Sequence, residues 1–305
     1  MVSFSNLISI NDLSRKQIEF IIQVAHQLKY SPEPNLLSGK VIASLFFEAS
    51  TRTRLSFESA VYRLGGQVIG FSDSGNTSLK QKGESLEDTI IMINGYADAI
   101  VIRHPEIGSA KIAATIADIP VINAGDGANE HPTQTLLDLF TINEHHGGLD
   151  GLHIGLVGDL KYGRTIHSLI KALSLFDHIQ ISLIAEDGFK LPQDLVEFID
   201  QSSMKVDYLD SIEQALPKLD VLYMTRLQRE RLGDSTLKVQ LKHCITDKLI
   251  QAYAKESLAI LHPLPRLEEI DISVDKLKQA RYFQQANNGL FVREALLKLL
   301  LIDKI

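Results

Sequence analysis

Residues 41–66, VIASLFFEASTRTRLSFESAVYRLGG, place a strand, a polar turn and a helix in succession. The apolar run Val41–Phe47 is typical of a buried strand, and later apolar residues recur at helical spacing until Gly65-Gly66. Ser50–Arg54 therefore lies where a strand ends and a helix begins. The first N–H groups of a helix are unpaired and partly positive, so hydroxyls and arginines there favour a phosphate-like dianion. An ordinary N-cap with two solvated arginines explains the same stretch, and the segment alone does not decide.

The alternation of strand and helix continues along the chain. Two such series are separated by a helix from about His131 to His146, which Gly147-Gly148 ends. A βαβ series implies a parallel sheet covered on both faces, so we expect an α/β protein with two doubly wound domains joined by a helix. The expected strands are 41–47, 67–71, 98–103, 120–123, 153–158, 179–185, 204–208, 219–223 and 257–261. The other expected helices are 11–29, 52–64, 84–97, 107–117, 164–176, 192–200, 211–216, 246–254 and 287–303.

The last of these helices, 287–303, is strongly apolar on one side. Periodicity does not say which domain it packs on, and we assign it to the first. The predicted domains are then 1–132 plus 289–305, and 133–288. Residues 226–244 are polar and weakly patterned, which indicates a long loop of the kind that is often functional.

Composition excludes several classes of protein. A chain of 305 residues with 45% apolar and 23% charged residues is typical of a soluble protein of about two domains. The net charge of −7 argues against nucleic acid as the main partner. We see no signal-peptide pattern and no apolar run of about 18 residues, so we expect no membrane span and a cytoplasmic location.

The single cysteine, Cys244, excludes an internal disulfide and a cysteine-rich zinc site. It follows His243, and a reactive pair can be imagined. Adjacent residues on an extended chain point apart, however, and a free cysteine is usually a small buried hydrophobe. We therefore expect no catalysis by this pair.

Cationic residues gather where the expected strands end, which is the edge at which open α/β sheets bind ligands. Scattered surface arginines would not favour one edge, so we expect a strongly cationic site for a small anion. Five of the six segments contain an arginine and the sixth contains His131: Ser50–Arg54, Arg103–Pro105, His131–Gln134, Gly158–Arg164, Thr225–Gln228 and His262–Arg266.

These segments resemble the aspartate/ornithine carbamoyltransferase family, and the resemblance covers essentially the whole chain. Phe47–Arg54 resembles the family's carbamoyl phosphate motif, and His131–Gln134 resembles a second motif that closes on the carbamoyl group. Thr77–Glu84 resembles the loop that, in the aspartate enzymes, reaches into a neighbouring subunit's site. His262–Arg266 resembles the aspartate branch, and the His-Cys-Leu-Pro motif of the ornithine branch is absent.

The resemblance implies transfer of the carbamoyl group of carbamoyl phosphate to the α-amine of L-aspartate, an early step of pyrimidine biosynthesis. It implies that each domain binds one substrate, that the domains close, and that a homotrimer shares its active sites between chains. Regulatory chains that form a larger holoenzyme are possible partners. We expect no cofactor and no metal, because the sequence has no ligand cluster and no Walker A motif, and Gly155–Asp159 lacks the third glycine of a dinucleotide motif.

The family motifs also assign roles to residues of the first domain. Arginine suits phosphate because its fork matches two oxygens at once. Charge that develops on the carbamoyl oxygen needs donors already in place, for which Thr53, Arg103 and His131 are candidates. Gln134 is expected to hold the carbamoyl NH₂. The expected phosphate ligands are Ser50, Thr51, Arg52, Thr53 and Arg103, with Ser78 and Lys82 from the adjacent chain.

L-Aspartate has two carboxylates, so two cationic clamps are expected in the second domain. Arg164 and Arg226 fit this role, Gln228 supports them, and Lys82 is a further contact. Leu264, next to Pro265 in the substrate-binding turn, is expected to offer its backbone carbonyl to the amine.

Arg54 lies two residues after Arg52, so its side chain points elsewhere on the helix. We interpret Arg54 as structural, bracing Glu84 or another carboxylate.

Two alternatives and one open question remain. A sister enzyme could use ornithine or another amine, although a cationic amino acid would meet Arg164 and Arg226. A catalytically silent scaffold is the other alternative, although such chains usually lose active-site residues. The proton acceptor is open, because His131 need not be a general base and the phosphate itself could accept the amine proton.

Overall fold

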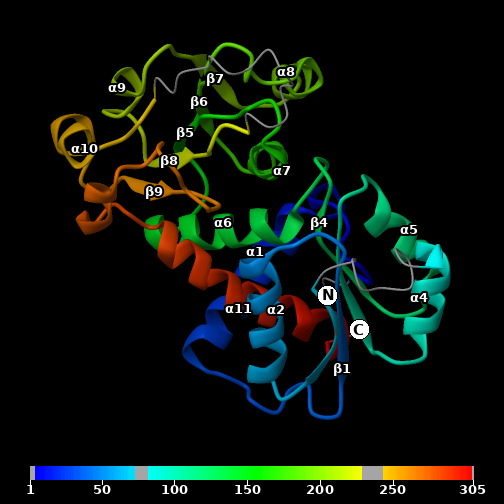
Figure 1. Cartoon of the computed structure of the whole chain (residues 1–305). Coiled ribbons are helices and arrows are strands. Elements are labelled where there is room, and N and C mark those ends of the chain that lie inside the picture. The colour runs from blue at the N-terminus through cyan, green and yellow to red at the C-terminus, as the bar shows by residue number, and fades with distance from the viewer. Residues whose placement is uncertain (1–3, 73–81, 229–242, 304–305) are drawn as a thin grey trace. The chain divides into compact units, whose positions relative to one another are not determined.

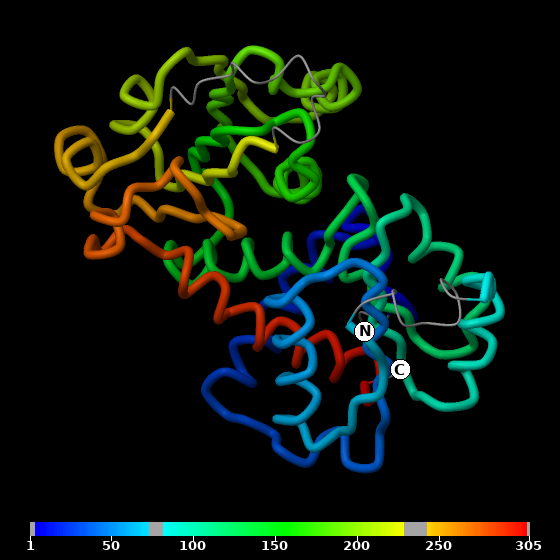
Figure 2. The backbone as a smooth tube through the Cα atoms, viewed as in Figure 1, coloured from blue at the N-terminus to red at the C-terminus, as the bar shows by residue number. Residues whose placement is uncertain are grey.

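The computed structural model describes residues 4–72, 82–228 and 243–303. The chain divides into two compact units, the first made of Met1–Phe140 and Asn287–Ile305 and the second of Thr141–Ala286. Each unit contains one parallel sheet with helices around it, which confirms the expected α/β class (Figure 1). The chain leaves the first unit within helix α6 and returns to it within helix α11 (Figure 2).

The first sheet has the strand order β2-β1-β3-β4, and every neighbouring pair is parallel. The strands β1, β3 and β4 are almost entirely buried, as their largely apolar runs predict. Because the strands are parallel, their carboxyl ends meet at one edge. The strands are β1 (Val41–Phe46), β2 (Gln67–Phe71), β3 (Ala99–His104) and β4 (Val121–Asp126).

Helices cover both faces of this sheet. Ala43 and Leu45 pack with Ile90 of α4 and Ala110 of α5, while the opposite face meets α2, where the Ser44 hydroxyl donates to Glu58. Figure 1 shows α2 on one side of β1 and α4 with α5 on the other. The helices wholly or partly in this unit are η1 (Ile10–Asp12), α1 (Arg15–Tyr30), α2 (Thr51–Arg63), α4 (Leu86–Asn94), α5 (Ser109–Ile116), α6 (Pro132–His146) and α11 (Tyr282–Leu301).

The second sheet has the order β7-β6-β5-β8-β9 and is also parallel throughout. One face packs Leu222 and Met224 against Leu216 and Ile250, under α9 and α10. Figure 1 shows α7 and α8 on the other side. The strands are β5 (His153–Val157), β6 (Gln180–Ile184), β7 (Lys205–Tyr208), β8 (Val221–Met224) and β9 (Ala259–Leu261). The helices are α7 (Arg164–Leu173), α8 (Gln193–Asp200), α9 (Ile212–Ala215), α10 (Asp247–Tyr253) and η5 (Ile272–Lys276).

The last helix begins earlier than its apolar stripe predicts, at Tyr282 instead of residue 287. The first turns contain polar residues that do not continue the apolar stripe. They are nevertheless buried, because they make specific contacts that periodicity does not show. Tyr282 is 0% exposed, and Gln285 accepts a hydrogen bond of 2.8 Å from the backbone N–H of His262.

Two further expectations concern the region before this helix. Cys244 is exposed, so its predicted burial is wrong, while its neighbour His243 is buried. The two side chains therefore lie in different environments, as alternation along an extended chain requires. Although Cys244 is exposed, partial desolvation of its thiol raises the pKa of that group, which disfavours the reactive thiolate. Most of the predicted loop 226–244 lies outside the described residues.

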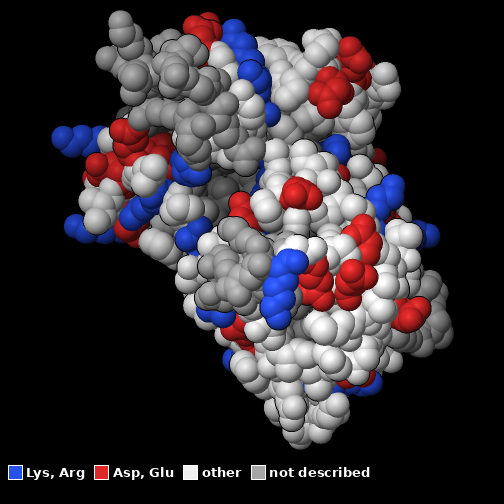
Figure 3. All heavy atoms as spheres, turned by 45° about the vertical axis from the view of Figure 1, so that its right-hand side comes forward, with Lys and Arg blue, Asp and Glu red and all other residues white. Residues whose placement is uncertain are grey.

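Charged side chains of both signs are interspersed on the face that Figure 3 shows. The cationic groups at the strand ends are thus local features of a chain whose net charge is −7. Among the described helices, none has both the length and the apolar character that a bilayer crossing requires.

Candidate active site

The start of helix α2 is open toward solvent. Ser50 precedes the helix with extended backbone angles, φ −155° and ψ 98°, and its hydroxyl makes no capping hydrogen bond. The interpretation of this residue as an ordinary N-cap is therefore wrong. The first-turn N–H groups lack a side-chain cap from Ser50, and the hydroxyl residues Thr51 and Thr53 lie in the same turn, a combination of donors that suits an anion.

The two arginines of this helix differ as expected. Arg52 is exposed, and its guanidinium has no ion pair or hydrogen bond with any residue that the structure describes. Arg54 contacts Glu58 one turn later, with 3.4 Å between Nη1 and Oε1. Its carboxylate partner is thus Glu58 instead of Glu84, and its structural role is compatible with this pair.

Arg103 ends the neighbouring strand β3, where its backbone lies beside Phe46. Its side chain is only 12% exposed and lies 3.1 Å from the Glu48 carboxylate. Burial lowers the pKa of Arg103, Glu48 opposes that shift, and the nearby positive charge of Arg52 lowers the pKa further. Two cations this close, one of them largely desolvated, favour an anion between or beside them. The sequence motif contained Glu48, but nothing in it showed which cation this carboxylate contacts.

His131 and Gln134 follow β4, the next strand of the same sheet. Pro132 occupies the first position of α6, a position that tolerates its missing N–H. His131 is 4% exposed, and its Nδ1 lies 3.4 Å from the Thr133 hydroxyl. The Gln134 amide nitrogen donates to Asp138 at 2.8 Å, which leaves the amide oxygen as the acceptor for another donor.

Two buried residues of opposite charge, Asp138 and Arg293, interact electrostatically next to Gln134. Asp138 is 0% exposed and Arg293 is 3% exposed, and the Arg293 guanidinium lies over the Phe57 ring with its central carbon 4.9 Å from the centroid. Burial lowers the pKa of Arg293 to about 9, against the opposing influence of Asp138, so the group remains charged at neutral pH. Sequence reasoning missed this electrostatic interaction, because Asp138 and Arg293 belong to helices that are far apart in the sequence.

The second sheet carries its own cationic edge. Arg164 is the first residue of α7, which has no side-chain cap, and it follows β5. Arg226 and Gln228 follow β8, the strand that pairs with β5. Because neighbouring parallel strands end at the same edge, the segments that carry both predicted clamps belong to one side of the sheet.

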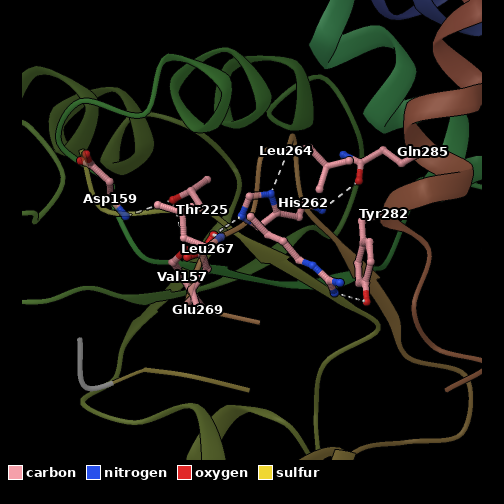
Figure 4. Close-up of polar contacts among 10 residues, drawn as sticks. Val157, Asp159, Thr225, His262, Leu264, Leu267, Glu269, Tyr282 and Gln285 are labelled. Atoms are coloured by element: carbon pink, nitrogen blue, oxygen red, sulfur yellow. Dashed lines mark hydrogen bonds and ion pairs between the residues drawn. The ribbon is translucent and has the colours of Figure 1, made fainter. Parts of the chain in front are cut away.

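Asp159, which sequence reasoning did not single out, joins these two segments. The side chain is 0% exposed, and its carboxylate accepts from the N–H of Tyr162 at 2.8 Å and of Gln228 at 3.1 Å. Its own N–H donates to the Thr225 hydroxyl at 3.0 Å (Figure 4). Burial raises the pKa of Asp159, and the backbone hydrogen bonds oppose that shift. A carboxylate directly after a strand-ending glycine was the available signal.

The turn after β9 completes this edge. Leu264 has a left-handed backbone with φ 58°, and its peptide bond to Pro265 is cis. Arg266 donates to the Asp275 carboxylate and, at 2.9 Å, to the Tyr282 hydroxyl.

Two predicted residues of the neighbouring-chain loop have different outcomes. Lys82 is exposed, and Ser78 lies outside the described residues. Within the described parts of the chain, no group of three or more histidine, cysteine or acidic side chains could hold a metal ion.

Comparisons with known proteins cover both halves of the chain. The family model described as "Aspartate/ornithine carbamoyltransferase, carbamoyl-P binding domain" matches residues 5–144. The model described as "Aspartate/ornithine carbamoyltransferase, Asp/Orn binding domain" matches residues 150–300.

Individual relatives match over nearly the full length. An aspartate carbamoyltransferase catalytic subunit from Vibrio vulnificus (strain CMCP6) is 51% identical over 302 residues, covering 98% of this chain and 97% of the relative. The corresponding subunit from Aliivibrio salmonicida (strain LFI1238) is 52% identical over 305 residues, with the same coverage of 98% and 97%.

Solved structures are also similar over nearly the full length of the chain. The catalytic subunit of M. jannaschii aspartate transcarbamoylase has a TM-score of 0.91 at 45% identity, covering 99% of each chain. Aspartate transcarbamoylase from Trypanosoma cruzi, solved in complex with carbamoyl phosphate and aspartate, has a TM-score of 0.90 at 37% identity, covering 98% of this chain and 97% of that chain.

Proposed function

The chain belongs to the aspartate/ornithine carbamoyltransferase family, and from this we infer that it transfers the carbamoyl group of carbamoyl phosphate to the α-amine of L-aspartate. The products are N-carbamoyl-L-aspartate and phosphate. The chain is a carbamoyl-group transferase, and an early step of pyrimidine biosynthesis is the place we propose for it. The similar Trypanosoma cruzi enzyme, solved with both substrates, supports this choice of substrates.

The observation that carries the choice of aspartate is the double cationic edge of the second sheet. Asp159 binds backbone N–H groups on both sides, two residues before Arg164 and two residues after Arg226. One carboxylate thus holds the backbone of both segments that carry the arginines, and two arginines suit an acceptor with two carboxylates. A cationic acceptor such as ornithine would be repelled by the same pair.

Carbamoyl phosphate is proposed to bind the first unit. Ser50, Thr51, Arg52 and Thr53, at the uncapped start of α2, supply N–H, hydroxyl and guanidinium donors to the phosphate. Arg103 adds a second guanidinium from the adjacent strand end. In the proposal, Ser78 and Lys82 come from a neighbouring chain.

The transfer itself needs stabilisation of one developing charge. The aspartate amine attacks the carbamoyl carbon, negative charge develops on the carbamoyl oxygen, and the bond to the phosphate oxygen then breaks. Thr53, Arg103 and His131 are proposed as the donors to that oxygen. This role requires the His131 proton on Nε2, the tautomer in which Nδ1 accepts from the Thr133 hydroxyl 3.4 Å away.

The remaining contacts orient the two reactants. Gln134 accepts from the carbamoyl NH₂ through the amide oxygen that its bond to Asp138 leaves available. Arg164 and Arg226 bind the aspartate carboxylates, with Gln228 and Lys82 as further polar contacts. Leu264 offers its carbonyl to the amine, and Pro265 lies beside it. Phosphate, as the leaving group, is the proposed acceptor of the amine proton.

The assembly is proposed on the same basis. We propose a homotrimer with shared sites. The relatives of high identity are named catalytic subunits, which supports an assembly with other subunits, and regulatory chains are possible partners. We also propose a cytoplasmic location, a reducing compartment that suits a chain with a single cysteine.

Incubation of the purified chain with carbamoyl phosphate and either L-aspartate or L-ornithine tests the proposal. We expect carbamoyl-aspartate, measured by its ureido group, and no citrulline. Citrulline without carbamoyl-aspartate would show the sister activity. Tight binding of carbamoyl phosphate with neither product would support a silent binding subunit.

A further inference from the structure

His262 is a buried histidine with both ring nitrogens in use. It follows strand β9, and its side chain and that of Glu269 are only 1% and 2% exposed. The N–H of Leu264 lies 2.8 Å from Nδ1, and Glu269 Oε1 lies 2.8 Å from Nε2 (Figure 4). A backbone N–H can only donate, so Nδ1 is the acceptor and the ring proton is on Nε2. Neither nitrogen is available to take a proton from a substrate.

Glu269 follows the turn 262–266 in the sequence and binds two of the residues before it. The same oxygen that accepts from His262 also accepts from the N–H of Leu267 at 3.1 Å. Burial acts to raise the pKa of Glu269, but the hydrogen bonds, that of His262 first among them, outweigh burial and lower it. The pair is therefore a neutral imidazole that donates to an ionised carboxylate.

Leu264, whose N–H contacts His262, has an unfavourable backbone conformation. Leu264 has a φ of 58°, which lies in the left-handed region that residues other than glycine and asparagine rarely adopt. Such a backbone conformation persists only where the surrounding structure enforces it. Its side chain packs on the core of the second unit, and its N–H is bound by His262. Among the described residues, no donor reaches its carbonyl oxygen.

We propose that His262 and Glu269 are positioning residues for the amino-acid substrate: they hold the Leu264 backbone in the conformation that presents its carbonyl to the substrate's α-amine. The inference rests on the proposed function, in which Leu264 binds that amine. His262 acts through the backbone of Leu264, and Glu269 acts through His262 and the N–H of Leu267.

Two substitutions of His262 separate its two contacts. In His262→Asn the amide oxygen takes the place of Nδ1 and can still accept from Leu264. In His262→Gln the amide nitrogen can reach Glu269, but the acceptor for Leu264 is lost. We expect His262→Gln to raise the KM for aspartate about tenfold or more, and His262→Asn to stay within about threefold of the wild type, because only His262→Gln leaves the Leu264 N–H without its acceptor. The KM for carbamoyl phosphate should be unchanged in both.

A matched control comes from another buried histidine of the same unit. His153 on β5 contacts the Ser182 hydroxyl at 2.8 Å through Nε2, and neither residue belongs to the turn. His153→Gln should lower the thermal midpoint to a similar degree and leave the KM for aspartate unchanged. Equal KM values for aspartate in His262→Asn and His262→Gln would overturn the proposal.

Glu269→Gln decides the matter if His262→Gln does not fold. It keeps the size and one oxygen acceptor but removes the charge that orders the imidazole. A rise of about threefold or more in the KM for aspartate supports the proposal, and an unchanged KM overturns it. Failure of the proposed function would be seen first and separately, as a wild-type chain that makes no carbamoyl-aspartate.

Discussion

Arg52 and Arg226 have the same side chain but belong to the edges of different sheets, so their loss should affect different substrates. We expect Arg52→Ala to raise the KM for carbamoyl phosphate and to lower turnover, since it removes charged hydrogen bonds to the phosphate. We expect Arg226→Ala to raise mainly the KM for aspartate. A hydrogen bond to a charged group contributes about 1.5–3 kcal/mol, which corresponds to a change of roughly ten- to hundredfold. Steady-state kinetics with each substrate varied in turn measures both effects.

Arg15→Ala is the matched control for these two variants. Arg15 is an arginine of α1 that contacts Glu19 one turn later, outside both proposed substrate sites. Its loss should leave both KM values unchanged. Comparable effects of Arg52→Ala and Arg226→Ala on both substrates would contradict the assignment of one substrate to each unit.

At the scale of elements, α2 is joined to α11 by an asymmetric ion pair. Arg63, in the last turn of α2, lies 2.7 Å from Glu294 of α11, and their side chains are 46% and 2% exposed. Burial raises the pKa of Glu294 above its usual value of 4.5, and Arg63 only partly opposes that shift. The charged carboxylate is thus costly in the folded state, even with its partner in contact.

This raised pKa predicts how stability changes with pH. Above pH 4.5 the folded chain holds the Glu294 proton more tightly than the unfolded chain, so the contribution of this group to stability is lost as pH rises through its folded pKa. The free energy of unfolding of the wild type, relative to Glu294→Gln, should therefore decrease from pH 5 to pH 7. Urea unfolding at constant protein concentration measures it, with Glu19→Gln as an exposed control. A difference that increases with pH would refute the argument.

At the scale of the whole molecule, the proposed trimer predicts complementation between inactive chains. Ser50→Ala and Lys82→Ala each impair every site of their own trimers. In mixed trimers, some sites take both an intact Ser50 and an intact Lys82, from different chains. Mixing under conditions of subunit exchange should therefore restore part of the activity.

A second mixture controls for non-specific rescue. Ser50 and Arg52 belong to the same helix start, so a mixture of Ser50→Ala and Arg52→Ala chains contains no intact site. It should regain no activity under the same exchange conditions. If the Ser50→Ala and Lys82→Ala mixture also regains none, the sites are not shared.

Periodicity alone was enough to predict the class of fold and the places of the strands, although it missed the start of α11. The strand pattern of residues 41–47 became β1, Val41–Phe46, because a strand buried on both faces must be continuously apolar. Strand ends are equally visible in a sequence, so the pattern by itself predicts Arg103 and Arg226 at the carboxyl edges of their sheets. The family motifs then gave each of these residues an expected role.

Contacts between distant residues were decided only by the tertiary structure. Asp159 accepts from Gln228, 69 positions later, and Arg293 supports Asp138 from another helix. A buried polar group must find a partner, but the sequence does not show which of many candidates will come within hydrogen-bond distance. The open start of α2 is of the same kind, because Ser50 is a good capping residue by type and only the absence of its side-chain hydrogen bond in the folded chain shows that it does not cap. Local patterns therefore predict where this protein binds its substrates, and packing determines what holds the proposed binding groups in place.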